Sequence, residues 1–235
     1  MSQPRLIVLV HGALHGAWCW AALQAELDRR GVPSLAIDLP GHGASTEPLR
    51  DMHGDAAAVA AVLERIPDEV VLVGHSYGGA VISQAGMARQ VARLVYLSAL
   101  VLDVDENAAD LMANLPQGDG VRQLFVRNAD GTLGADPTKA VDAFYGTCSP
   151  EFAAAASARL SPQRAATLKQ PATLAAWRER PSTFIRCLQD RAVTLPMQDA
   201  LAKRCTDVLT LDCDHSPFGS CPAELADLLA PMTRR

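Results

Sequence analysis

The segment of residues 70–79 constrains the fold of this chain more than any other. Its first four residues are apolar and β-branched or Leu, as in a buried strand, and Gly74, Ser76 and Gly78 follow at alternate positions before a helical stretch. A serine at such a sharp strand-to-helix turn has a strained backbone, and side chains two positions before and after it would collide. The pattern therefore predicts Ser76 as an accessible nucleophile at the carboxyl edge of a sheet, beside a helix N-terminus.

Strand-like and helix-like stretches alternate through both ends of the chain. Short apolar runs predict strands at residues 6–10, 34–37, 69–73, 93–97, 183–187 and 207–211. Apolar residues at helical spacing predict helices at residues 18–30, 51–65, 79–89, 197–202 and 222–229. This alternation is typical of an α/β fold, with a mostly parallel central sheet and helices on both of its faces.

The alternation stops between residues 104 and 181. Helical stretches at residues 150–160, 162–169 and 174–179 are broken here by proline and glycine, and few runs resemble strands. We interpret this segment as a helical lid inserted into the sheet. The 235 residues are then one α/β core, residues 1–103 and 182–235, with a lid insertion at residues 104–181.

Ser76 needs a general base, because a serine hydroxyl is a weak nucleophile at neutral pH unless a base, itself oriented by a third group, takes its proton. The sequence has six histidines. Five of them lie at or before residue 75, whereas His215 follows the last predicted strand in a loop at the carboxyl edge of the sheet. We therefore predict His215 as the base, in the chain order nucleophile, acid, histidine.

The acid that orients this histidine is expected just past the strand that precedes the histidine strand. Asp190 occupies that place and is our prediction. Asp103 is a rival, because it follows the fourth predicted strand at a slightly greater distance. Asp212 and Asp214 are further rivals, but they stand too close to His215 along the chain to reach its far ring nitrogen easily.

An acyl-transfer site also needs preorganised donors for the oxyanion of the tetrahedral intermediate, normally two backbone N–H groups. The N–H of Tyr77, directly after the nucleophile, is the first predicted donor. The turn after the first strand, His11-Gly12-Ala13, supplies the second at the N–H of Ala13, because Gly12 permits a close approach of the backbone.

Composition excludes several classes of partner. The formal net charge is −5 and lysine and arginine form no cluster, which argues against nucleic acid and favours a neutral small-molecule substrate. The six cysteines form no C-x-x-C pair and have no histidine at metal-ligand spacing, so we expect free thiols, no metal and no cofactor.

The sequence also bears on membrane association. No apolar run approaches the roughly 18 residues needed to cross a bilayer, so we expect no membrane partner. Residues 1–5 lead directly into the first strand without the features of a signal peptide. We therefore expect a cytoplasmic protein, and the sequence leaves a homodimer open as its assembly.

Four motifs spread over nearly the whole chain carry a family resemblance. They are HGALHGAW at residues 11–18, GHSYGG at residues 74–79, CSPE before an alanine-rich helix at residues 148–151, and DHSPF at residues 214–218. Together they resemble the plant methylesterase and hydroxynitrile lyase family of the α/β hydrolases, with its bacterial esterase relatives.

The resemblance implies an α/β-hydrolase fold with a lid over a mostly apolar pocket. It implies Ser76, Asp190 and His215 as a catalytic triad, and the N–H groups of Ala13 and Tyr77 as the oxyanion hole. Beside this, Leu14 and Leu100 are candidate substrate contacts because they lie on loops at strand ends. Phe144 and Trp177 of the predicted lid are further candidates, and each of these four side chains could equally belong to the core.

Two positions separate the activities of this family. In its hydroxynitrile lyases the second residue of the opening turn is threonine, and a lysine that stabilises departing cyanide follows the catalytic histidine. This chain has Gly12 and Ser216 there. The resemblance therefore implies a serine esterase that hydrolyses a small, partly apolar carboxylic ester through an acyl-enzyme. A carbon–carbon lyase and a non-catalytic ligand-binding scaffold are the alternatives.

Overall fold

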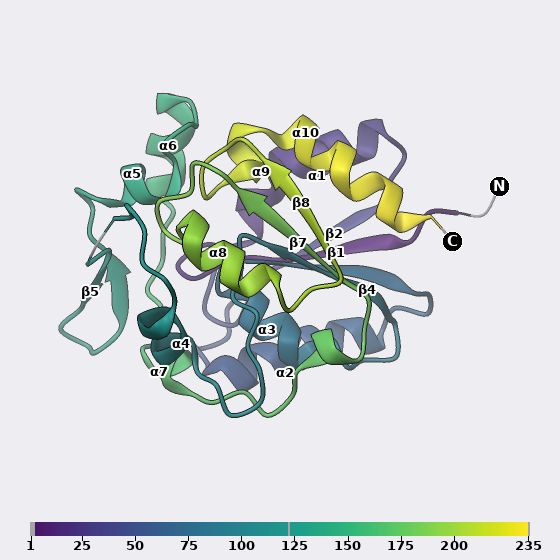
Figure 1. Ribbon diagram of the computed structural model, residues 1–235, viewed down its shortest axis with the longest axis horizontal. Coiled ribbons are helices and arrows are strands. Elements are labelled where there is room, and N and C mark those ends of the chain that lie inside the picture. The colour runs from purple at the N-terminus through teal and green to yellow at the C-terminus, as the bar shows by residue number, and fades with distance from the viewer. Residues whose placement is uncertain (1–2, 122, 235) are drawn as a thin grey trace.

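The computed structural model describes residues 3–121 and 123–234 (Figure 1). Met1, Ser2 and Arg235 of the predicted core and Arg122 of the predicted lid lie outside this part. Six strands form one sheet in the order β2–β1–β3–β4–β7–β8, and every neighbouring pair in it is parallel. The strands are β1 (Leu6–Val10), β2 (Ser34–Ile37), β3 (Val70–His75), β4 (Val91–Leu97), β7 (Ser182–Cys187) and β8 (Asp207–Leu211). The predicted α/β fold with a parallel central sheet is confirmed.

Helices cover both faces of this sheet (Figure 1). One face carries α1 (Ala21–Arg29), α9 (Pro217–Ser220) and α10 (Pro222–Leu229), with 3₁₀ helices at Ala17–Trp20 and Ala230–Thr233. The other face carries α2 (Met52–Glu64), α3 (Gly78–Ala85) and α8 (Leu195–Ala202). Apart from the short α9, these helices lie where apolar residues at helical spacing predict them.

The sheet separates two apolar cores because successive side chains of a strand point to opposite faces. In β1, Val8 and Val10 pack into the core under α2 and α3, whereas Ile7 and Leu9 pack into the core under α1 and α10. All four side chains are fully buried. A strand buried on both faces is continuously apolar, and this continuity makes the central strands recognisable in the sequence.

Between β4 and β7 the chain runs through a loop, residues 98–103, and then through an insertion, residues 104–181, whose elements lie beside the sheet core. Its helices are α4 (Ala108–Asn114), α5 (Ala140–Phe144), α6 (Pro150–Ser157) and α7 (Ala166–Lys169), with a 3₁₀ helix at Ala176–Arg178. It also contains an antiparallel hairpin of β5 (Phe125–Arg127) and β6 (Leu133–Ala135), which the sequence reading did not anticipate (Figure 1). Strands of three residues are too short to show the alternation of apolar and polar residues by which a strand is recognised in a sequence.

Hydrogen bonds attach this insertion to loops at the carboxyl edge of the sheet. The hydroxyl of Tyr145 lies 2.8 Å from Nε2 of His15. The N–H of Thr147 donates to the carboxylate of Asp214 at 2.8 Å, and the N–H of Ser161 donates to the Leu14 carbonyl at 2.8 Å. The insertion is therefore fixed over the edge where the predicted nucleophile lies.

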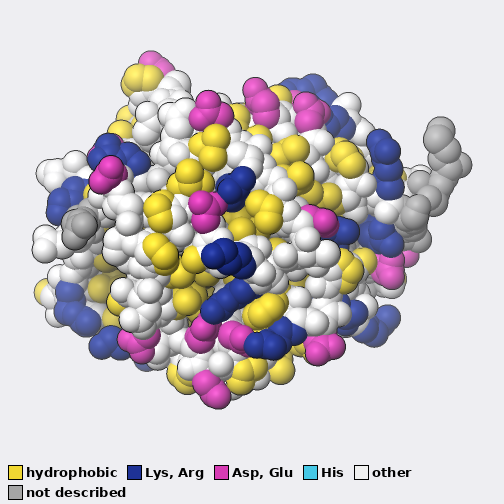
Figure 2. Space-filling view, in the orientation of Figure 1, with side chains coloured by type: hydrophobic (Ala, Val, Ile, Leu, Met, Phe, Trp, Pro, Cys, Tyr) yellow, Lys and Arg dark blue, Asp and Glu magenta, His cyan; other side chains and the backbone are white. Residues whose placement is uncertain are grey.

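The surface gives no sign of a single-charge face in the view of Figure 2, where basic and acidic side chains are interspersed with apolar ones. Ion pairs such as Arg204 with Glu106 and Arg186 with Asp199 join basic and acidic side chains of the protein. Within the described residues no helix has both the length and the apolar character needed to cross a membrane. The six cysteines are free thiols.

Candidate active site

Ser76 lies on the turn between β3 and α3 and has a backbone φ of +53°. This left-handed conformation is strained for a residue with a side chain, as the motif predicts. A Cβ at Gly74 would lie 2.5 Å from the carbonyl oxygen of Gly78, and a Cβ at Gly78 would lie 2.7 Å from that of His11. The two glycines are therefore required by close packing around the serine, which is itself partly exposed.

His215 and Asp190 form a buried pair at the same edge of the sheet. Nδ1 of His215 lies 2.6 Å from Oδ2 of Asp190, and both side chains are almost fully buried. With the carboxylate accepting at Nδ1, that nitrogen carries the hydrogen and Nε2 is left as a proton acceptor. Nε2 makes no hydrogen bond to another described residue, and the ring lines the same cavity as Ser76.

The carboxylate of Asp190 accepts four hydrogen bonds. Oδ1 accepts the backbone N–H groups of Ala192 at 2.7 Å and Val193 at 2.9 Å. Oδ2 accepts the hydroxyl of Ser98 together with the ring N–H of His215. An ionised carboxylate offers about four lone-pair positions, so this carboxylate is fully satisfied although it is buried.

The three rival carboxylates are engaged elsewhere. Asp103 forms an ion pair with Arg178 at the surface. Asp212 accepts a hydrogen bond from the side chain of Gln189 at 2.9 Å, and Asp214 accepts backbone and hydroxyl groups of the surrounding loops. Among the described residues, none of these three bonds to the ring of His215. Asp190 is the carboxylate that the fold places on this ring.

Ala13 and Tyr77 both line the cavity beside Ser76. Their backbone N–H groups make no hydrogen bond to any other described residue, so both are available to a ligand. The turn that carries Ala13 packs directly on the nucleophile, because a Cβ at Gly12 would lie only 2.9 Å from Cβ of Ser76 and 3.0 Å from Nδ1 of His75. The structure thus brings together the two donors that the sequence predicts.

Three further histidines surround the site as neutral, structural groups. Burial lowers the pKa of His11 to about 3 and that of His15 to about 4, and it lowers the pKa of His75 well below its ordinary value. Nε2 of His75 donates to the backbone carbonyl of His215 at 2.7 Å. His75 therefore fixes the loop of the predicted base, a contact for which the sequence carries no signal beyond proximity to Ser76.

The side chain of Tyr77 has a hydrogen-bond partner that the sequence did not indicate. Its hydroxyl donates to Oδ2 of Asp55 on α2 at 2.7 Å, while Oδ1 of Asp55 has no hydrogen-bond partner among the described residues. Asp55 is almost fully buried, and this burial raises its pKa to about 7. The phenol of Tyr77 is thus held by a carboxylate of α2 through its hydroxyl.

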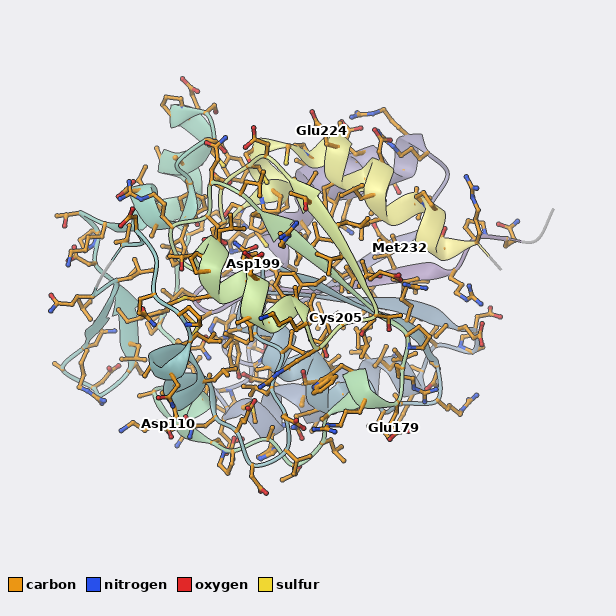
Figure 3. All side chains as sticks on the ribbon, in the orientation of Figure 1. Asp110, Glu179, Asp199, Cys205, Glu224 and Met232 are labelled. Atoms are coloured by element: carbon orange, nitrogen blue, oxygen red, sulfur yellow. The ribbon has the colours of Figure 1, made fainter. Side chains whose placement is uncertain are left out.

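The cavity has a volume of about 220 Å³ and is lined from two sides. The sheet core contributes the polar groups, Ser76 and His215, together with Ala13, Tyr77, Leu100, Ala192 and Val193. The insertion contributes apolar side chains throughout, Ala108, Ala109, Met112, Leu124, Phe125, Phe144 and Leu168. Asp110 of α4 points away from the sheet at the outside of the molecule, so α4 presents its apolar side to the cavity (Figure 3).

The structure divides the four predicted substrate contacts. Leu100 lines the cavity, and so does Phe144, whose ring stacks on that of His215 at 5.6 Å between centroids. Leu14 is fully buried in the core and does not line the cavity. Trp177 is also away from it, with its indole N–H donating to the Leu102 carbonyl at 2.9 Å. The position of a residue on a loop at a strand end therefore does not show whether its side chain packs in the core or contacts a ligand.

Within the described residues, no group of three or more histidine, cysteine and carboxylate side chains has an arrangement that could hold a metal ion. The polar groups of the cavity are instead a hydroxyl, an imidazole and backbone N–H donors, which is a set suited to acyl transfer.

Comparison with known proteins identifies the family. The model of the alpha/beta hydrolase family matches residues 7–228. The alpha/beta hydrolase nvfD of Aspergillus novofumigatus is 31% identical over 252 aligned residues, which cover 100% of this chain and 96% of that protein. Methylesterase 17 of Arabidopsis thaliana is 28% identical, with 97% of this chain and 91% of that protein covered.

Solved structures agree with these matches. A pyrethroid hydrolase from Sphingobium faniae has a TM-score of 0.84 and 27% sequence identity with this chain, and the match covers 97% of each chain. The family model, the relatives and the structural match extend over nearly all of the sequence, insertion included. The chain belongs to the alpha/beta hydrolase family, as an enzyme related to plant methylesterases and other hydrolases.

Proposed function

We propose that this protein is a serine esterase that hydrolyses small, partly apolar and uncharged carboxylic esters. The observation that carries the proposal is that the buried His215–Asp190 pair opens into the same apolar cavity as Ser76. Methylesterases among its relatives support ester hydrolysis as the reaction. In this proposal Ser76 is the nucleophile, His215 the general base and Asp190 the orienting acid.

The first half of the reaction forms an acyl-enzyme. Neutral His215 takes the proton of the Ser76 hydroxyl at Nε2 while Oγ attacks the ester carbonyl carbon. The oxyanion that develops accepts the N–H groups of Ala13 and Tyr77, and the Asp190 carboxylate stabilises the imidazolium. The tetrahedral intermediate then expels the alkoxide, which takes the proton from Nε2 and leaves as the alcohol.

The second half repeats these steps with water. His215 accepts a proton from a water molecule whose oxygen attacks the acyl carbon, and the oxyanion forms again on the same two N–H donors. Collapse of this intermediate releases the carboxylic acid, and the proton held at Nε2 returns to the Ser76 oxygen. The cycle needs no group that the triad and the oxyanion donors do not supply.

The cavity wall favours a small neutral substrate. Apart from His215 and Tyr77, the described residues that line the cavity carry no ionisable side chain. A charged group of the substrate placed against the apolar side chains of the insertion would lose its hydration without gaining a partner, which is costly. The volume of about 220 Å³ lies below the range of about 300–1,000 Å³ typical of sites for drug-sized ligands. We infer that the insertion serves as a lid over a small apolar group of the ester.

Two observations argue against cyanohydrin cleavage. Expulsion of cyanide calls for a cation beside the histidine, whereas Ser216 is uncharged and fully buried. No lysine or arginine is among the residues that line the described cavity. The N–H groups of Ala13 and Tyr77 instead match the oxyanion of ester hydrolysis.

One assay tests this proposal against both alternatives. Purified protein is offered p-nitrophenyl acetate, short methyl esters and mandelonitrile, and Ser76→Ala is measured beside it. We expect turnover of the esters, no cyanide release above the uncatalysed rate, and a loss in kcat on the order of 10⁴ to 10⁶ in Ser76→Ala. Cyanide release that depends on Ser76, with the esters untouched, would make the protein a lyase. Binding of esters without any turnover would make it a receptor scaffold.

A further inference from the structure

Ser98 directly follows the last residue of β4 and is fully buried. Its hydroxyl donates to Oδ2 of Asp190, the same oxygen that accepts the ring N–H of His215. Ser98 is not among the residues that line the cavity. The hydroxyl therefore acts on the acid and base pair and makes no contact with the substrate.

The short segment around Ser98 connects the nucleophile to the acid. The N–H of Ser76 donates to the Leu97 carbonyl at 3.3 Å, and the N–H of Leu100 donates to the Ser76 carbonyl at 3.0 Å. The N–H of Ser98 donates to the carbonyl of Ile185 at 2.9 Å, on the strand that leads to Asp190. This connection follows from the strand order, because β4 lies between β3, which carries Ser76, and β7.

The backbone at Ser98 is strained. Its φ of +39° lies in the left-handed region, which glycine adopts more readily than a residue with a side chain. A serine held in such a conformation in the core, when glycine would relieve the strain, points to a use for its hydroxyl. Asp190 is the acceptor of that hydroxyl in this structure.

We propose that Ser98 is a positioning residue of the triad, whose hydroxyl orients the Asp190 carboxylate and shares its negative charge with the imidazole of His215. The inference rests on the proposed function of the triad. Without the hydroxyl, Oδ2 faces His215 alone, so the carboxylate turns more freely and more of its charge acts on the ring.

Two variants separate the hydroxyl from the backbone. Ser98→Ala and Ser98→Gly both remove the hydroxyl, but the glycine variant also relieves the positive φ. We expect kcat for p-nitrophenyl acetate to fall on the order of tenfold in both, as for loss of a hydrogen bond to a charged group, with KM unchanged. Ser83→Ala is the matched control, since Ser83 is a buried serine whose hydroxyl bonds to the Gly79 carbonyl and the Tyr96 hydroxyl. We expect wild-type kinetics in this control.

The pH profile gives a second readout. The titratable groups around His215 are Asp190 on Nδ1, His75 at 4.5 Å between ring centroids, and His15, which packs against His75. His15 and His75 stay neutral near pH 7 because burial lowers their pKa values. Removal of the Ser98 hydroxyl leaves more negative charge facing the imidazole, which stabilises its protonated form. We expect the acid limb of kcat/KM to move to higher pH in both Ser98 variants.

Proton NMR of the resting protein gives a readout that needs no turnover. The hydrogen between His215 and Asp190 should resonate at low field and be missing from Asp190→Asn, and we expect it to move further downfield in both Ser98 variants. A wild-type protein without esterase activity would overturn the proposed function, whereas this resonance would still test the role of Ser98. An unmoved resonance, wild-type kcat in both variants, recovery of full activity in Ser98→Gly alone, or an equal loss in Ser83→Ala would each overturn the inference.

Discussion

The two walls of the cavity differ in kind. The wall from the sheet core carries the hydroxyl, the imidazole and the N–H donors, all on loops that follow parallel strands. The wall from the insertion carries alanine, methionine, leucine and phenylalanine, on short helices and a hairpin. The chemistry of the proposed esterase therefore resides in one wall, and the shape and polarity that select a substrate reside largely in the other.

Substitutions in the two walls should therefore act on different kinetic constants. Core residues that touch the reacting atoms stabilise the transition state, so their loss lowers kcat. Apolar side chains of the insertion bind the ground state and the transition state about equally, so their loss raises KM. Single substitutions in each wall separate the two effects, and the largest is expected in the core wall.

Asp190→Asn should cause a large loss of activity, because Asp190 orients the base of the core wall. An amide in place of the carboxylate favours the wrong tautomer of His215 and no longer stabilises the imidazolium, so we expect kcat to fall about 10⁴-fold. Steady-state assays of p-nitrophenyl acetate hydrolysis measure this change in kcat. Asp103→Asn, which alters a surface ion pair with Arg178, is the matched control and should retain wild-type kcat. Equal losses of kcat in the two variants would show that Asp190 does not act as the acid that orients His215.

Gly12→Ala should misplace the nucleophile. Its Cβ would lie 2.9 Å from Cβ of Ser76, so the opening turn or the serine must shift, and a displacement of this kind costs about 10²-fold in kcat. Gly134→Ala is the control, because the nearest atom to a Cβ there is a side-chain oxygen of Asn128 at 3.4 Å. Unchanged kcat in Gly12→Ala would refute the close packing of the turn on Ser76.

Met112→Ala tests the insertion wall. Removal of this side chain should raise KM for an apolar ester about tenfold and leave kcat within a factor of about two. Asp110→Ala on the same helix, with its side chain outside the cavity, should change neither constant (Figure 3). A fall in kcat with KM unchanged would contradict the division between the walls.

Asp55→Asn should give the smallest effect, one on stability. Burial raises the pKa of Asp55 to about 7 in the folded protein, above the value of about 3.9 in an unfolded chain. Its contribution to stability is therefore lost as pH rises from about 4 through about 7. Asparagine still accepts the Tyr77 hydroxyl but does not ionise, so the Tm of the variant relative to wild type should increase between about pH 5 and about pH 8. Thermal denaturation of both proteins at about pH 5 and about pH 8 measures this difference in Tm. The same difference at both pH values would refute the raised pKa of Asp55.

The sequence predicted the two walls unequally, for physical reasons. The central strands could be located within about two residues because runs such as residues 6–10 are apolar on both faces of the sheet. The hairpin of β5 and β6 escaped prediction because its three-residue strands are at least partly exposed and carry no periodic pattern. Local sequence patterns therefore locate strands that are buried on both faces better than short, partly exposed strands such as β5 and β6.

The candidate site shows the same limit. Ser76 and its glycines can be recognised in the sequence because strain and close packing require fixed residue types at fixed spacing. Ser98 and Asp55 have no such spacing, since each reaches its partner through the strand order or the packing of a helix. Their contacts join residues far apart in the sequence, and only the folded chain brings them together.

The central claim is that Ser76 is the nucleophile of an acyl-transfer reaction. A fluorophosphonate that reacts with activated serine hydroxyls tests it, with intact-protein mass spectrometry and peptide mapping as the readout. We expect one adduct per chain, on the peptide that contains Ser76, no adduct in Ser76→Ala, and slowed labelling in Asp190→Asn, because the base loses its orientation. Stoichiometric labelling at another residue, or an unlabelled wild-type protein, would contradict the account.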